Sequence, residues 1–166
     1  MGYTCGTCGV VHDELPMSFG PHAPFPWFNI PESERAERCV LDENLCGIDE
    51  HRFVRGRIEL PVRDGPEPFV WLVWVSLSAQ NFERTVDLWT HAGREQEPPY
   101  FGWLTTALPY APSTLGLKTQ VHTRPVGVRP SIDLEPTDHP LAIEQHHGIT
   151  MARVREIAES ILHPRR

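Results

Sequence analysis

Two cysteines near the start of the chain have a spacing that suits a metal ion. Cys5 and Cys8 are separated by Gly6 and Thr7. Two intervening residues let the chain turn so that both thiolates reach one zinc ion, at about 2.3 Å each. Gly9 follows the second cysteine, where a glycine relieves the crowding because it adopts positive φ at little cost. We therefore expect an N-terminal Cys-x-x-Cys zinc knuckle.

A closed structural zinc site needs four ligands, so two more residues must complete it. Cys46 is followed by glycine, as Cys5 and Cys8 are, and it is the third candidate. His12 lies shortly after the knuckle and is the fourth, while Cys39 competes for either place. The predicted metal site is thus Cys5, Cys8, Cys46 and His12, with zinc as a structural cofactor.

Three other interpretations of the cysteines remain open. A redox dithiol requires a strand before the motif and a helix after it, whereas here Gly9 and then Pro16 follow. A disulfide framework requires export, and the first residues have neither a charged region nor an apolar one, so we expect a reducing cytoplasmic location. The third interpretation is that the cysteines bind no metal and the protein folds without one.

Histidines allow an enzyme as an alternative. His122 ends a predicted strand, and His139 begins a predicted helix directly after Asp138. A carboxylate such as Glu135 or Asp138 beside an imidazole would fix its tautomer and raise its basicity. The chain contains neither His-Glu-x-x-His nor Gly-x-Ser-x-Gly, however. His139 is also placed to cap a helix that begins at Pro140, so His122 and His139 are weak catalytic candidates.

Two further groups of residues could form binding surfaces. The aromatic segment from Pro98 to Trp103 would line a pocket for a peptide or a small apolar ligand if its rings are exposed, and would otherwise fill the core. Arg55, Arg57, Arg124 and Arg129 would form an anion-binding patch if they converge. If they do not, they are solvated strand residues or guards of a sheet edge.

Composition limits the class of protein. The chain has 166 residues, of which 40% are hydrophobic and 22% charged, and these values suit one globular domain over residues 1–166. Its net charge of −7 disfavours nucleic acid, and no apolar run is long enough for a membrane helix. The expected partner is therefore another protein or a small-molecule ligand, with no nucleic acid and no membrane.

The elements that must position these residues follow from hydrophobic periodicity. Residues 1–30 look like a loop-rich segment that carries the knuckle, and residues 31–166 look like an α+β core. Strands followed by helices, without β-α-β alternation, predict an α+β fold whose sheet is largely antiparallel. The predicted helices are 31–38, 79–91, 139–147 and 150–162, and the predicted strands are 52–62, 69–77, 103–108, 117–123 and 130–134, the first two as a hairpin.

Several runs of sequence resemble an uncharacterised bacterial family, domain of unknown function 2199. The runs occur in the same order and span nearly the whole chain; they are Tyr3–His12, Leu15–Gly20, Trp74–Ser78, Pro99–Leu104 and Glu135–Ala142. This resemblance implies neither an activity nor catalytic residues, because the family has none assigned.

Three functions therefore remain. The first is a zinc-stabilised binding or interaction module of the cytoplasm, without catalysis. The second is a metal-dependent enzyme that uses His122, His139 and nearby carboxylates. The third is a toxin-neutralising or regulatory partner protein, for which an acidic surface would suit a basic toxin.

Overall fold

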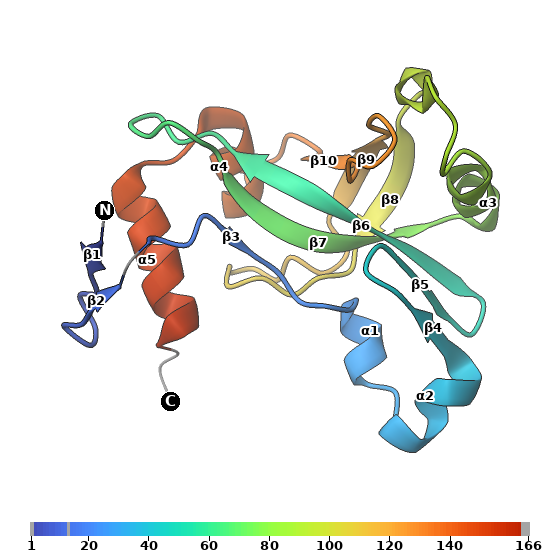
Figure 1. Ribbon diagram of the computed structural model, residues 1–166, viewed down its shortest axis with the longest axis horizontal. Coiled ribbons are helices and arrows are strands. Elements are labelled where there is room, and N and C mark those ends of the chain that lie inside the picture. Colours follow the sequence, from blue (N-terminus) through green and yellow to red (C-terminus); the bar gives the residue numbers. More distant parts are fainter. Residues whose placement is uncertain (1, 13, 164–166) are drawn as a thin grey trace.

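The computed structural model describes residues 2–12 and 14–163, which form a small barrel with additional strands and five α-helices around it (Figure 1). The strands are β1 (Tyr3–Thr4), β2 (Val11–His12), β3 (Ser18–Phe19), β4 (Cys39–Leu41), β5 (Leu45–Ile48), β6 (His51–Leu60), β7 (Phe69–Leu77), β8 (Tyr100–Leu104), β9 (Lys118–His122) and β10 (Ser131–Leu134). The helices are α1 (Phe25–Phe28), α2 (Glu32–Arg38), α3 (Ala79–Asp87), α4 (Pro140–His147) and α5 (Met151–Leu162), with a 3₁₀ turn at Arg94–Gln96. None of the helices described is long and apolar enough to cross a membrane.

Strands β6 to β10 form a closed ring. Each strand pairs antiparallel with the next, and β10 then pairs with β6. Because five strands alternate in direction, the last runs the same way as the first, so the closing pair must be parallel. It is, with Ser131 opposite Arg57. Since β3 also pairs parallel with β7, the sheet is mixed, and the expectation of a largely antiparallel sheet is corrected.

The hairpin predicted from the apolar run at 69–77 is confirmed. Strands β6 and β7 pair from Arg52 opposite Leu77 to Leu60 opposite Phe69. Both strands are longer than the ring requires, so one edge of each pairs with two other strands. Strand β6 pairs with β5 and β10 along this edge, and β7 pairs with β3 and β8. Their inward side chains, with those of α4 and α5, form the main core; its largest fully buried members include Trp71, Phe69, Ile58, Leu60, Leu141 and Ile157.

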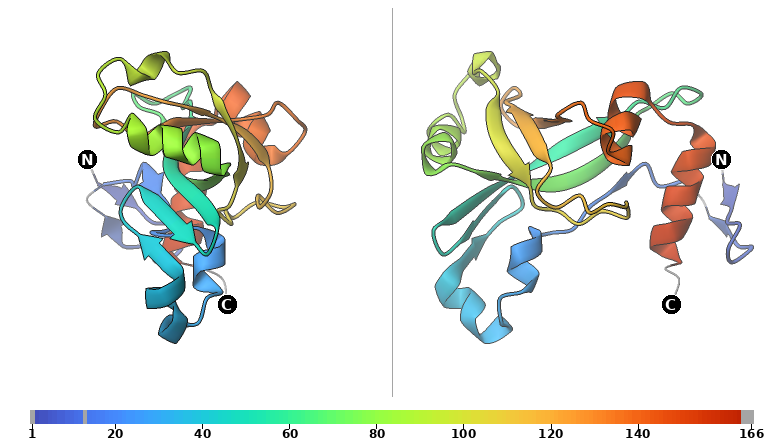
Figure 2. Two further views of the ribbon diagram at one scale, coloured as in Figure 1. Left: turned by 90° about the vertical axis from the view of Figure 1, so that its right-hand side faces the viewer. Right: turned by 180° about the vertical axis from the view of Figure 1, so that it is seen from behind.

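Some local predictions were wrong in position. The strand expected at 103–108 is β8, which begins at Tyr100. Strands β4 and β5 were not predicted, because their alternation spans only three and four residues. They form an antiparallel extension of β6 that packs on a second, smaller core around Trp74, with α1 and α2 beside it (Figure 2). Part of the segment expected to be loop-rich, β3, enters the main sheet.

Gly56 lets the ring close. A Cβ atom at this position would lie 2.6 Å from side-chain carbons of Ile132 and 2.9 Å from the carbonyl oxygen of Pro130. Both residues belong to the segment that docks on β6, and Arg57 donates its backbone N–H to Pro130 at 2.9 Å. Any side chain at position 56 would therefore push β10 away from β6.

We expect Gly56→Ala to lower the free energy of unfolding by about 1–3 kcal/mol, the usual cost of overpacking. Gly47→Ala is the matched control, because Gly47 lies on the neighbouring β5 and its nearest contact is the flexible end of Arg52 at 3.3 Å. Its effect should stay within about 0.5 kcal/mol. Urea unfolding of both variants measures the difference, and equal effects would contradict a close approach at Gly56.

An ion pair joins α3 to the segment just before β8. Arg84 contacts both carboxylate oxygens of Glu97, at 3.2 and 2.8 Å, and Tyr100 donates its hydroxyl to the same carboxylate. These bonds, Arg84 first, lower the pKa of Glu97 to about 2. Because this pKa lies below the ordinary value of 4.5, the pair stabilises the fold fully above pH 4.5 and loses that contribution as the pH falls toward 2.

Glu97→Gln should therefore lower the free energy of unfolding by about 1 kcal/mol at pH 7. The value is modest because the side chain of Arg84 is half-exposed. The difference from the parent protein should shrink as the pH falls from about 4.5 toward 2. Chemical unfolding across this pH range measures it. Glu83→Gln is the control, because Glu83 is exposed on α3 next to Arg84, and its effect on stability should show no such pH dependence. If the loss of stability in Glu97→Gln does not depend on pH, the assignment of the ion pair is contradicted.

Candidate metal centre

The first cysteines lie in a short hairpin. Strands β1 and β2 pair antiparallel, and the turn between them is closed by two backbone hydrogen bonds, Cys5 N–H to Val10 O at 3.0 Å and Gly9 N–H to Cys5 O at 2.9 Å. Gly9 has φ of +70°, the conformation predicted for the glycine after the second cysteine. The turn holds Cys5 and Cys8 near each other, as the Cys-x-x-Cys spacing predicted.

Four side chains converge at this turn. One donor atom from each of Cys5, Cys8, His12 and His163 lies within 4.8 Å of the others. The Cys8 Sγ and His12 Nε2 atoms are 3.7 Å apart. Bonds of 2.0–2.3 Å in a tetrahedral zinc site place neighbouring donor atoms roughly 3.3–3.8 Å apart. The cluster therefore has the donor types and the compactness of a Cys₂His₂ metal site.

His163 comes from the far end of the described chain. Helix α5 starts at Met151, is capped by the side chain of Thr150, and buries Val154 and Ile157 in the main core. His163 follows its last turn and belongs to the same cluster as Cys5, Cys8 and His12. The β1–β2 hairpin lies along α5 (Figures 1 and 2). The Nε2 atom of His163 is buried and has no hydrogen-bond partner among the residues described, as expected of an imidazole nitrogen that is free to bind a metal.

Polar contacts hold this arrangement in place. Glu159, on α5, accepts a hydrogen bond from the Gly6 N–H at 2.6 Å and so joins the helix to the knuckle. Tyr3 stacks on the ring of His12, with centroids 5.3 Å apart. The pKa of the Cys5 thiol is lowered, chiefly by the backbone N–H of Cys8 and against the opposing effect of burial. A lower pKa favours the thiolate, the form that binds metal.

Cys46, which the sequence predicted as the third ligand, does not lie in this cluster. It belongs to β5, is only 2% exposed and packs with Phe53 and Trp74 in the smaller core. Burial raises the pKa of its thiol to about 12, so it remains protonated. Cys39, the competitor, lies on the adjacent β4. The fourth side chain of the cluster is that of His163, and no sequence spacing links it to the knuckle.

The two weak catalytic candidates have different surroundings. His122 Nε2 lies 3.0 Å from Asp133 Oδ2, with both side chains about half exposed. His139 is buried and caps α4: its Nδ1 accepts the Leu141 N–H at 3.1 Å, and its Nε2 lies 2.8 Å from the carbonyl oxygen of Pro112. Since Nδ1 accepts, Nε2 must carry the proton. Both ring nitrogens of His139 are therefore occupied by structural bonds.

Neither candidate gathers a set of metal-binding side chains. In the part of the chain that the structure describes, neither His122 nor His139 belongs to a group of three or more histidine, cysteine or carboxylate donors within metal-binding reach. Glu135 and Asp138 are exposed, and the cap of α4 is His139 rather than Asp138. Within residues 2–12 and 14–163, the one such group is the Cys₂His₂ cluster.

A family model matches residues 4–149, a range that includes Cys5, Cys8 and His12 but not His163. Its family is described as an uncharacterized protein conserved in bacteria, domain of unknown function 2199. The chain belongs to this family. The comparisons find no match among curated proteins and none among solved structures. Membership in the family confirms the resemblance seen in the sequence and assigns no reaction.

His139→Ala should lower the free energy of unfolding by about 1–2 kcal/mol, because it removes a helix cap and a buried hydrogen bond. His122→Ala, which removes a half-exposed pair, should change it by less than about 0.5 kcal/mol. Urea unfolding of the two variants tests this ranking. The reverse order would contradict the structural role of His139.

Proposed function

We propose that this protein is a zinc-stabilised binding module of the cytoplasm, without catalytic activity. The observation that carries the proposal is the convergence of four donor atoms from Cys5, Cys8, His12 and His163. Four protein ligands fill a tetrahedral zinc ion and leave no position for water or substrate, which distinguishes a structural site from a catalytic one. A reducing compartment keeps both thiols available as ligands.

The proposed role of the ion is to join the first hairpin to the end of α5. Strands β1 and β2 contain two residues each, and a two-stranded hairpin of this size is not stable by itself in water. Besides the four clustered side chains, the hydrogen bond from Gly6 to Glu159 connects this hairpin to α5. Zinc bound by residues on both segments would supply the stability that the hairpin lacks.

Exposed aromatic rings support a binding role rather than a purely structural one. Phe101 and Trp103, on the outer face of β8, are 42% and 46% exposed and form an edge-to-face pair with centroids 5.0 Å apart. The sequence left open whether the rings of this segment are buried; Tyr100 is buried, whereas these two are not. Large exposed rings of this kind are typical of contact surfaces for other molecules.

Zinc content is the direct test. The purified protein should contain one zinc ion per chain by elemental analysis. Zinc should be absent from each of the variants Cys5→Ser, Cys8→Ser and His163→Ala, and the melting temperature of each should be lower. A loss of about 3 kcal/mol in the free energy of unfolding corresponds to a fall of roughly 6–12 °C in a chain of this size.

Cys46→Ser is the matched control, because it makes the same chemical change at a thiol outside the cluster. It should retain the zinc even though it disturbs the smaller core. Stoichiometric zinc that is lost in Cys46→Ser but kept in His163→Ala would overturn the assignment of the ligands. If the protein folds without metal and its melting temperature is unchanged in both Cys5→Ser and Cys8→Ser, the proposed structural role of zinc would be overturned.

A further inference from the structure

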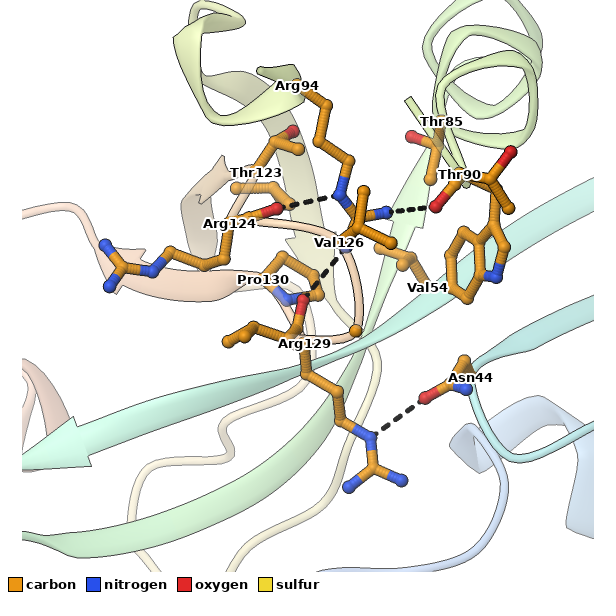
Figure 3. Close-up of a pocket in the computed structure, with 14 residues that line it drawn as sticks. Asn44, Val54, Thr85, Thr90, Arg94, Thr123, Arg124, Val126, Arg129 and Pro130 are labelled. Atoms are coloured by element: carbon orange, nitrogen blue, oxygen red, sulfur yellow. Dashed lines mark hydrogen bonds between the residues drawn. The ribbon is translucent and has the colours of Figure 1, made fainter. Parts of the chain in front are cut away.

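Three of the four arginines that could have formed an anion-binding patch converge on the outside of the barrel. Arg55 and Arg57 are two residues apart on β6 and therefore project from the same face. The buried Gly56 lies between them. The parallel pairing of Ser131 with Arg57 places Arg129 beside Arg55 on the same face. Arg124 is exposed, and its guanidinium points away from Arg129 (Figure 3).

The guanidinium groups of Arg55 and Arg129 have neutral partners. Arg129 donates its Nε–H to the side-chain oxygen of Asn44 at 2.9 Å, and its two terminal nitrogens make no hydrogen bond to any residue that the structure describes (Figure 3). Arg55 donates to the carbonyl oxygens of Glu43 and Pro21, at 3.4 and 3.2 Å. Among the residues described, neither arginine forms a salt bridge, and the Nε of Arg55 is buried without a hydrogen-bond partner.

The positive charges of Arg55 and Arg129 act on each other. Burial lowers the pKa of Arg55, and the positive charge of Arg129 lowers it further, while Glu43 offsets part of the effect. Arg57 pairs with Glu59 at 3.3 Å, but both side chains are more than one-third exposed, so this pair contributes little. Three guanidinium groups thus share one face with the carboxylates of Glu43, Glu59 and Asp133, on a chain whose net charge is −7.

A groove of about 650 Å³ lies at these arginines. Arg57 and Arg129 line it on one side of the charge balance and Glu43 on the other. Val70 and Leu72 of β7 contribute apolar surface, and Ser18 and Asn44 add neutral polar groups. The loop that carries Arg129 is held by Arg94, whose guanidinium donates to the carbonyl oxygens of Trp89, Arg124, Pro125 and Val128 at 2.8–3.2 Å (Figure 3). Arg129 is therefore presented by a fixed segment.

We propose that this groove binds a small molecule through an oxyanion, a phosphate or carboxylate group held between Arg57 and Arg129. Guanidinium groups match both oxyanions because their planar array of N–H donors binds two oxygens at once. The negative net charge of the chain repels extended polyanions, so the ligand is a small molecule rather than a nucleic acid. The apolar floor suits a ligand whose body is less polar than its charged group.

This inference deepens the proposed function, since it rests on the protein being a binding module, but it does not depend on the metal site. Isothermal titration calorimetry of the full-length, metal-loaded protein tests it, with inorganic phosphate in one arm and acetate in the other, at constant ionic strength. We expect saturable binding of at least one anion. The arm that binds identifies phosphate or carboxylate as the recognised group, and binding in neither arm overturns the proposal.

Arg129→Gln should weaken the binding at least tenfold, whereas Arg124→Gln should leave it unchanged. The control removes the same charge from the same loop, outside the groove. Arg57→Gln should also weaken binding, and this variant tests the site if Arg129→Gln does not fold. Equal weakening by the Arg124 and Arg129 variants would show a general charge effect and overturn the site. Zinc content, measured in every sample, separates this result from failure of the metal proposal.

Discussion

The closure of a five-stranded ring is the constraint on which the rest of the structure depends. An odd number of strands that alternate in direction can close only through a parallel pair, here between β10 and β6. That pair needs close backbone approach, which Gly56 permits because it has no side chain to contact Ile132 and the carbonyl of Pro130. The same pairing sets Arg129 beside Arg55, so the requirement for closure also determines what the outer face presents.

The length of the two central strands organises the remaining elements. Strands β6 and β7 have ten and nine residues, whereas the other strands of the ring have four or five. Their surplus length pairs with β5 and β3, and the outer face of β7 then becomes a second core around Trp74. This explains why β7 is buried on both faces, as its continuous apolar run predicted.

The Cys₂His₂ cluster lies outside both cores and has a different physical basis. The first hairpin has strands of only two residues, and the Gly6–Glu159 hydrogen bond joins it to α5 next to the four donor side chains. The barrel, in contrast, is stabilised by buried aliphatic and aromatic side chains. Under our proposals the protein has two separate charged sites, one that binds a cation at the hairpin and one that binds an anion on the barrel.

The sequence by itself determined the features that depend on neighbouring residues. Spacing predicted the knuckle at Cys5 and Cys8, glycine chemistry predicted the positive φ of Gly9, and periodicity predicted the β6–β7 hairpin and the helix that ends at Leu162. Each of these rests on turn geometry or on a repeat of 2 or 3.6 residues, which can be read locally.

Only the tertiary structure decided which distant residues meet. His163 replaced Cys46 in the cluster because α5 returns along the first hairpin, and no local spacing records that return. Arg55, Arg57 and Arg129 converge, and Arg124 does not, because parallel closure brings residues 129–131 beside β6. The direction of that closing strand follows from the number of strands in the ring, a property of the whole fold rather than of any one segment.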